Sequence, residues 1–395
     1  MLRTPRSISF CLTWFVYRQR ALRQLRTKPV NRYTHKNNDS DDKKIRHLNE
    51  SQEDKVFFHK SKGQHILTNQ RVLDTIVRKS NIKPADSVLE IGPGTGNLTL
   101  KLLEVAKKVF AIEIDKRMVD ILNKRVAERG FQDRLTVICK DALKTEFPQF
   151  DIVVANIPYG ISSPLVAKLV YGANPFRSAT LLLQKEFARR LLASPGDSEF
   201  NRLAVNVKLV ADVEFVMDVS KRDFLPCPKV DSSVVIIRPK AEIPAVNLDE
   251  WWAFTRTCFT KKNKTLGATF KQKKKVIELL RLSKEMVPNS ENVVNVDSCD
   301  SGEDDDDDDD DNNDDETAIE KFCSPSCLEK ETSLYKEKIM RVLKSGAFED
   351  KRPSKLSNEE LLHLLSLFNQ AGIYFHDQSE RKNADNVAFA AAYSL

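Results

Sequence analysis

One short motif, Asn156-Ile157-Pro158-Tyr159, combines an amide, a forced turn and an aromatic ring. It follows the apolar run at 151–155, which predicts a buried parallel strand that stops at a turn. Ligands of open α/β sheets bind at the carboxyl ends of the strands. Such a motif could hold a planar base by its face while two carbonyl oxygens accept hydrogen bonds from its amino group. The simpler alternative is a strand-end turn with a half-buried tyrosine, and the upstream sequence decides between the two.

A glycine-rich turn lies upstream of this motif. Residues 87–92 predict a first strand, 93–96 the turn after it, and 97–108 a helix with apolar residues at helical spacing. Glycines in such a turn let the backbone approach a ligand closely. The spacing is G-x-G-x-G, and not the G-x-G-x-x-G of dinucleotide-binding enzymes. Alone, this turn is weak evidence for a nucleotide.

Two carboxylates follow the next two predicted strands. Glu113 ends the run at 109–113, 21 residues after Gly92, where an acid typically accepts hydrogen bonds from ribose hydroxyls. Asp141 follows the run at 135–139 and could accept a hydrogen bond from the amino group of an adenine. The glycine turn, Glu113, Asp141 and Asn156 at the ends of four successive strands together indicate an adenosyl ligand. The glycine spacing disfavours a nicotinamide cofactor, and the Asn-x-Pro-Tyr motif favours S-adenosylmethionine.

These motifs resemble those of the ribosomal RNA adenine dimethyltransferases, most closely the eukaryotic-type dimethyladenosine transferases. The resemblance spans residues 62–377 and rests on six segments, namely Gly-Gln-His-Ile-Leu at 63–67, Glu-Ile-Gly-Pro-Gly-Thr-Gly-Asn at 90–97, Asn-Ile-Pro-Tyr-Gly-Ile-Ser-Ser-Pro at 156–164, Leu-Gln-Lys-Glu at 183–186, Phe-Leu-Pro-Cys-Pro-Lys-Val-Asp-Ser at 224–232 and Phe-Thr-Lys-Lys-Asn-Lys-Thr-Leu at 259–266. Many methyltransferases share the glycine motif. The combination of the first, third and fifth segments is far more specific.

The resemblance assigns the methyl-donor site to six residues, namely His65, Leu67, Gly92, Glu113, Asp141 and Asn156. The first two would belong to a segment that closes over the donor. The glycine would contact the donor through its backbone, and the two acids would bind its ribose and its adenine.

The resemblance also implies three catalytic residues, Asn156, Tyr159 and Phe224. Asn156 would contact both the donor and the target base, and the two rings would sandwich an extruded adenine. Two residues depart from the family pattern: Cys227 stands where a proline is common, and Gly160 where a larger polar residue is usual. The cysteine would make its turn less rigid without removing a catalytic atom, whereas the glycine concerns the shape of the base pocket.

The implied activity is N6-dimethylation of adenines, expected at two adjacent positions in a small-subunit ribosomal RNA hairpin, with S-adenosylmethionine as cofactor. The implied partner is the pre-ribosomal small subunit, and the protein is expected to be a monomer. A second hypothesis is a non-catalytic ribosome-assembly or organellar transcription factor with the same fold. The presence of every donor and pocket position favours catalysis. A third hypothesis, a DNA adenine methyltransferase, shares the motif chemistry.

The chain is long enough for two domains, and the pattern changes after residue 239. We expect an α/β, class I (Rossmann-like) S-adenosylmethionine-dependent methyltransferase domain at 55–240 and a smaller, mostly helical domain at 247–395. Ser357 and Glu360 predict a capping box at the start of one helix, and Gly372 its end. An acidic insertion at 288–330, expected to be disordered, interrupts the helical domain.

The net charge of +6 is unevenly distributed. Residues 297–316 hold 14 acids and no base, and without them 63 bases face 43 acids, a net charge of +20. A basic folded part suits a polyphosphate partner such as RNA. The lysines within 261–264 and 271–275 are the candidates for RNA contact, although each could equally lie on a solvated helix face.

The first 38 residues contain nine Lys or Arg and no acid. Their apolar run at 8–17 is too short to span a bilayer, and arginines follow it where a signal peptide would be cleaved. Residues 1–50 therefore predict a transit peptide and leader for the mitochondrion, with a basic tail of a nucleolar protein as the alternative. No other segment is apolar enough to cross a membrane. The cysteines show no zinc spacing, so we expect no metal.

Overall fold

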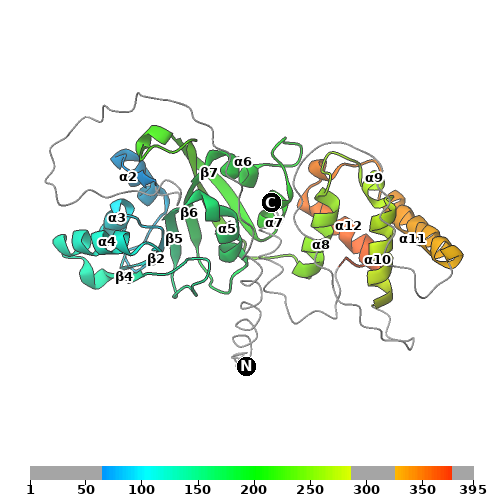
Figure 1. Cartoon of the computed structure of the whole chain (residues 1–395), viewed down its shortest axis with the longest axis horizontal. Helices are drawn as coiled ribbons and strands as arrows, with labels where there is room; N and C mark the ends of the chain where they lie inside the picture. Colours follow the sequence, from blue (N-terminus) through cyan, green and yellow to red (C-terminus); the bar gives the residue numbers. More distant parts are fainter. Residues whose placement is uncertain (1–64, 286–324, 376–395) are drawn as a thin grey trace, which may run out of the picture. The chain divides into compact units, whose positions relative to one another are not determined.

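The computed structural model describes residues 65–285 and 325–375 (Figure 1). All of these described residues belong to one compact unit. The expected leader at 1–50 and most of the expected acidic insertion lie outside the described residues. A helix begins at Pro325, so the last residues of the range given to the insertion belong to this helix.

A seven-stranded sheet forms the framework of the N-terminal part (Figure 1). Its strand order is β4-β3-β2-β5-β6-β9-β7. The strands β2, β3, β4, β5 and β6 run parallel to one another. Strand β9 runs antiparallel to both of its neighbours, β6 and β7. Their bounds are β2 (Ser87–Ile91), β3 (Lys108–Ile112), β4 (Leu135–Ile138), β5 (Ile152–Asn156), β6 (Ser178–Gln184), β7 (Ala211–Val219) and β9 (Ser232–Pro239). The four strands expected at 87–92, 109–113, 135–139 and 151–155 are confirmed to within one residue.

The central strand β5 is buried on both sides. Successive side chains of a strand point to opposite faces of the sheet. Accordingly, Val153 and Ala155 belong to one hydrophobic cluster, while Ile152 and Val154 belong to another. This burial on both faces explains why the strand reads as a continuous apolar run rather than as an alternating one.

The helices of this part connect the strands in the βαβ manner, and a separate pair of short strands lies beside them. The helices are α2 (Gln70–Lys79), α3 (Asn97–Val105), α4 (Lys116–Glu128), α5 (Ser162–Tyr171), α6 (Lys185–Leu192) and α7 (Arg202–Val210), with 3-10 turns η2 (Gln132–Arg134), η3 (Tyr159–Ile161) and η4 (Lys221–Asp223). The helix expected at 97–108 is three residues shorter, because Ala106 already has an extended backbone with φ −91° and ψ 157°. The short strands β1 (Ile66–Leu67) and β8 (Phe224–Leu225) pair antiparallel with each other.

The C-terminal part is helical, as expected. It contains α8 (Leu248–Phe259), α9 (Leu266–Phe270), α10 (Lys273–Glu285), α11 (Pro325–Ser345), η5 (Pro353–Lys355) and α12 (Asn358–Gln370). The capping box at the start of α12 is confirmed, since Ser357 accepts a bond from the Glu360 backbone and the Glu360 side chain accepts one from the Ser357 backbone. Gly372, just beyond the helix, has φ +66°.

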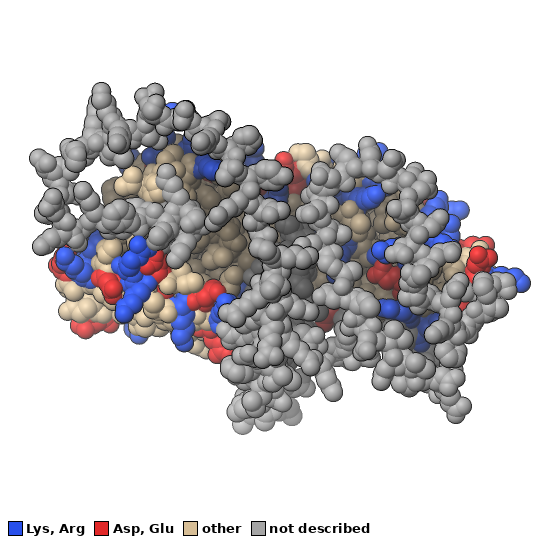
Figure 2. Space-filling view, viewed as in Figure 1, with Lys and Arg blue, Asp and Glu red and all other residues tan. Residues whose placement is uncertain are grey.

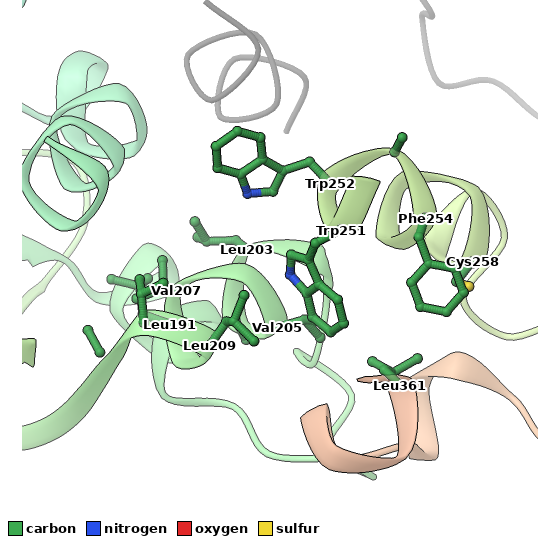
Figure 3. Close-up of a cluster of buried hydrophobic side chains, with 14 of the residues drawn as sticks. Leu191, Leu203, Val205, Val207, Leu209, Trp251, Trp252, Phe254, Cys258 and Leu361 are labelled. Atoms are coloured by element: carbon green, nitrogen blue, oxygen red, sulfur yellow. The ribbon is translucent and has the colours of Figure 1, made fainter. Parts of the chain in front are cut away.

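The two parts share a hydrophobic core. Figure 3 shows Trp251 of α8 close to Val205 and Leu209 of α7, with Leu361 of α12 nearby. Trp251 is fully buried, and all four residues belong to the cluster that also includes Val153 and Ala155 of β5. The expected division between 240 and 247 thus falls between β9 and α8, but the core continues across it.

Candidate active site

A cavity of about 480 Å³ lies at the carboxyl ends of β2, β3, β4 and β5. This volume falls within the range of about 300–1,000 Å³ that is usual for small-molecule sites. The structure brings together on its wall all six residues expected to bind the donor, namely His65, Leu67, Gly92, Glu113, Asp141 and Asn156. Tyr159 also lines the cavity. The glycine turn and the three polar side chains predicted from four separate strand ends therefore border one space.

The glycine turn between β2 and α3 requires residues without a side chain. Gly92 and Gly96 have φ values of +70° and +88°, which L-residues rarely adopt. A Cβ atom at Gly92 would lie 3.3 Å from Pro158 Cδ, and one at Gly96 would lie 2.5 Å from Leu122 Cδ1. The turn thus packs against both the Asn-Ile-Pro-Tyr motif and α4 while its backbone borders the cavity.

Glu113 fixes this turn from the end of β3. Its Oε2 accepts a hydrogen bond from Gly94 N at 3.2 Å, and its Oε1 accepts one from Asp115 N at 3.0 Å. The side chain is buried, and this burial raises the pKa of the carboxyl above its ordinary value. The carboxylate therefore connects the two loops that flank the place expected for a ribose.

Asp141 begins the loop after β4. Its Oδ1 accepts a hydrogen bond from Leu143 N at 3.0 Å, and its Oδ2 lies 3.6 Å from Lys144 Nζ. Ala142 and Leu143 line the cavity beside it. This loop thus supplies both an acceptor and an apolar surface, which suits the edge and the face of an adenine ring.

Asn156, the last residue of β5, contacts the segment that closes one side of the cavity. Its Nδ2 donates to the carbonyl oxygen of His65 at 3.1 Å. The side-chain oxygen is the only acceptor of the amide, so it is the atom that can accept a hydrogen bond from a ligand. The amide therefore has a fixed orientation between His65 and the turn that carries Tyr159.

Tyr159 lies in η3, directly after the motif's proline. Its hydroxyl is 2.8 Å from Ser232 Oγ, and its ring lies 6.1 Å from the His65 ring with an interplanar angle of 27°. Burial raises the pKa of the phenol, so it stays neutral at physiological pH. A Cβ atom at the following Gly160, which is exposed and does not line the cavity, would meet nothing within 4 Å among the described residues, so a larger side chain would find room there.

Phe224 occupies a less exposed position than a stacking residue requires. It pairs with Leu67 in the β1–β8 ladder, and only 4% of it is exposed. Its ring packs in the hydrophobic cluster that contains Leu67 and Val234, and it does not line the cavity. The structure therefore places Phe224 beside Leu67, but the ring that faces Tyr159 is that of His65.

Sequence reasoning missed Glu90 as a site residue, although its motif was noted. The residue lies within β2, lines the cavity and is 1% exposed. Its Oε2 has no hydrogen-bond partner in the part of the chain that the structure describes. Burial raises the pKa of this carboxyl to about 8. An acid inside an otherwise apolar strand is the signal that could have revealed it, because acids are seldom fully buried without a partner.

Two further findings concern only residues 65–285 and 325–375. No group of three or more His, Cys, Asp or Glu side chains there is arranged to hold a metal ion. None of the described helices combines the length and the apolar composition needed to cross a membrane.

Comparison with known proteins agrees with this geometry. The family model of ribosomal RNA adenine dimethylase matches residues 56–301. The chain is 60% identical over 366 residues to the mitochondrial ribosomal RNA small subunit methyltransferase of Arabidopsis thaliana, covering 93% of this chain and 92% of that protein. It is 41% identical to the dimethyladenosine transferase of Yarrowia lipolytica, covering 79% and 89% of the two chains.

A solved structure gives the same result. The crystal structure of a dimethyladenosine transferase from Plasmodium falciparum superimposes with a TM-score of 0.64 at 39% identity, covering 79% of this chain and all of that one. The class I methyltransferase fold is thereby confirmed. The chain belongs to the ribosomal RNA adenine dimethylase family.

Proposed function

We propose that this protein transfers methyl groups from S-adenosylmethionine to the N6 atoms of adenines, two adjacent ones, in a hairpin of small-subunit ribosomal RNA. The observation that carries the proposal is the placement of Asn156 and Tyr159 on the wall of the donor cavity. The amide there is oriented by His65, and its oxygen is available to a base that lies against the tyrosine ring. One pocket can thus hold both the methyl group and its acceptor.

The cavity fits S-adenosylmethionine in two respects besides its volume. Glu90 offers a buried carboxyl oxygen without a partner among the described residues, and the amino group of the donor could hydrogen-bond to it. Glu113 and Asp141 offer acceptors for the ribose and the adenine. When bound, S-adenosylmethionine supplies an electrophilic methyl group; the protein supplies position and electrostatics.

The residues beside this methyl group would make the adenine amine reactive. That amine is a poor nucleophile, because its lone pair is delocalised into the ring. The Asn156 oxygen and the Ile157 carbonyl can bind its two N–H groups and favour a pyramidal nitrogen whose lone pair points at the methyl carbon. Alignment of this kind can lower a barrier by about 7–11 kcal/mol. No strong base is needed, because the nitrogen becomes acidic on alkylation, and this explains why an amide serves where a carboxylate is absent.

Tyr159 would provide the face on which the extruded adenine stacks. Such stacking contributes about 1–3 kcal/mol per base, which helps offset its removal from the RNA. The hydrogen bond to Ser232 restrains the orientation of the tyrosine ring. We propose Phe224 as the second stacking residue; to reach the base, its ring would have to leave its buried place beside Leu67.

The RNA strand next to the target base would run over a second hollow of about 430 Å³. Its charged lining residues are four bases, Lys185, Arg189, Lys221 and Lys229, and three acids, Glu186, Glu199 and Asp231, so bases are in a slight excess. It adjoins the base pocket, because Asp231 lines it and the next residue, Ser232, contacts Tyr159. Basic and acidic side chains are interspersed on the face seen in Figure 2, so a local hollow is a more specific candidate than the surface as a whole.

The lysines expected from sequence to contact RNA differ in their availability. Lys262 Nζ donates to Ser198 O at 2.8 Å, and Lys271 and Lys275 pair with Glu349 and Glu278 at 2.9 and 2.7 Å. The other four are exposed, namely Lys261, Lys264, Lys273 and Lys274. These four remain our candidates for RNA contact by the helical part.

The compartment is proposed on the basic leader and on one relative. The protein from Arabidopsis thaliana that is 60% identical to this chain is named as mitochondrial. The acid-free first 38 residues suit import into the same organelle. We therefore propose that a monomer acts in mitochondria on the ribosomal small subunit during its biogenesis, with the nucleolus as the alternative compartment.

The test is a transfer assay with labelled S-adenosylmethionine and small-subunit RNA from mitochondrial and from cytosolic ribosomes. We expect label in adenine for the wild type and none for Asn156→Ala, with equal RNA binding by both. Asn123→Ala, an exposed change on α4, serves as the matched control and should retain full activity. Absence of label in adenine with folded wild-type protein would refute the proposed function, and full activity of Asn156→Ala would refute the assigned pocket.

A further inference from the structure

Lys168, on the second turn of α5, lies against the loop that follows β4. Its ammonium group donates to three backbone carbonyl oxygens, those of Ala142 at 2.7 Å, Leu143 at 3.2 Å and Thr145 at 2.5 Å. The same group lies 4.1 Å from the centre of the Phe147 ring. A single side chain thus contacts most of one loop.

The chemistry of the ammonium group suits this position. It carries three donors and no acceptor, and each donor here meets a carbonyl oxygen. The aromatic face adds a cation–π attraction. Arginine could not reproduce the arrangement, because its donors form a planar fork instead of converging on one nitrogen. Removal of the group would leave three partly buried carbonyl oxygens to find other partners.

The contacted loop is the one that carries Asp141. Thr145 donates to the Asp141 carbonyl oxygen from both its backbone nitrogen, at 3.0 Å, and its hydroxyl, at 2.7 Å. The Asp141 carboxylate in turn accepts from Leu143 N at 3.0 Å. The loop is therefore closed on itself around the aspartate, and Lys168 attaches it to α5.

The other end of α5 belongs to the base pocket. The helix begins at Ser162, directly after the η3 turn that contains Tyr159. One rigid helix thus connects the turn proposed to hold the target base with the loop proposed to bind the donor's adenine. The distance between the target base and the donor's adenine therefore depends on the contacts that hold this loop against α5.

We propose that Lys168 is a positioning residue for recognition of the methyl donor. Its ammonium group holds the loop at 141–145 so that the Asp141 carboxylate meets the amino group of the donor's adenine at a fixed distance from the base pocket. The inference rests on the proposed function for the identity of the donor. The experiment that tests it, however, measures binding of S-adenosylhomocysteine, the demethylated donor, in the absence of RNA.

The experiment measures dissociation constants by calorimetry for S-adenosylhomocysteine and for S-inosylhomocysteine, in which oxygen replaces the adenine amino group. The wild type should prefer the adenine form. Lys168→Met should weaken binding of S-adenosylhomocysteine by about tenfold or more, as expected for loss of hydrogen bonds from a charged group, and should bring the two constants close together. In the transfer assay its KM for the donor should rise much more than its kcat falls. Lys336→Met, an exposed change on α11, is the matched control and should leave both constants unchanged.

Three outcomes would overturn the proposal. One is an unchanged constant for a folded Lys168→Met protein. Another is an equal loss for both ligands, which would indicate a merely structural role. The third concerns Lys168→Arg, which is used if the methionine variant fails to fold. The proposal would be wrong if this variant discriminated between the two ligands as well as the wild type does. A wild type that binds neither ligand would instead refute the proposed donor, so the two failures are distinguishable.

Discussion

Glu90 should make the stability of this protein fall as pH rises, and Glu90→Gln should remove that dependence. The carboxyl lies inside β2, 1% exposed, and its burial raises its pKa from the ordinary value of 4.5 to about 8. The native protein therefore retains a proton that the unfolded chain has already released. Unfolding releases this proton over the interval between the two pKa values, so each step up in pH within it favours the unfolded state.

The size of the effect follows from the interval. One pH unit corresponds to about 1.4 kcal/mol when unfolding releases one full proton. Release is slightly less than one proton near pH 5 and near pH 7.5, so over this range the carboxyl should lower the free energy of unfolding by about 3 kcal/mol. Glutamine has nearly the same shape and no proton to release in this range. The difference in unfolding free energy between Glu90→Gln and the wild type should thus grow in favour of the variant across these pH values.

Denaturant unfolding of both proteins at pH 5, 6.25 and 7.5 measures this difference directly. Titrating groups that do not interact with Glu90 contribute equally to both proteins, so they cancel in the comparison. Asn123→Ala, an exposed change on α4 that involves no titrating group, should show no such divergence from the wild type. If the curves of Glu90→Gln and the wild type stayed parallel over the whole range, Glu90 would be ionised in the native state and the reasoning from burial would be wrong.

Three further predictions concern the base pocket, the glycine turn and the RNA path. Tyr159→Ala should lower methyl transfer to RNA at least tenfold through loss of stacking, while Tyr159→Phe, which loses only the Ser232 contact, should retain most of it; donor binding in both should stay near that of the wild type. Gly96→Ala should lower the melting temperature by several degrees, since its φ of +88° and the 2.5 Å approach to Leu122 cost about 1–3 kcal/mol. Lys221→Glu should weaken RNA binding and flatten its salt dependence without changing donor affinity, as filter binding at several salt concentrations would show.

The donor cavity could be predicted from sequence because its parts are local. Glu113 and Asp141 each follow an apolar run, and a parallel sheet brings the ends of such runs to one edge. The glycine turn is similarly fixed by a few adjacent residues. Prediction from strand ends therefore identified residues that the structure places on one wall.

Features that depend on long-range packing could not be predicted in this way. The burial of Phe224 results from its pairing with Leu67, which is 157 residues away in the chain. The intramolecular contacts of Lys168 and Lys262 depend on which loops pass their side chains in the folded protein. A lysine that binds carbonyl oxygens and one that faces solvent look alike in a sequence. Only the folded arrangement separates them.

The β1–β8 ladder bears on how two methyl groups reach one adenine. A dimethylated product consumes two donors, so the spent cofactor has to be replaced before the second transfer. His65 directly precedes β1 and contacts both Asn156 and Tyr159. Any displacement of β1 during this exchange would therefore disturb the two residues that are proposed to hold the adenine. The same contacts that order the base pocket thus couple it to the exchange of the cofactor.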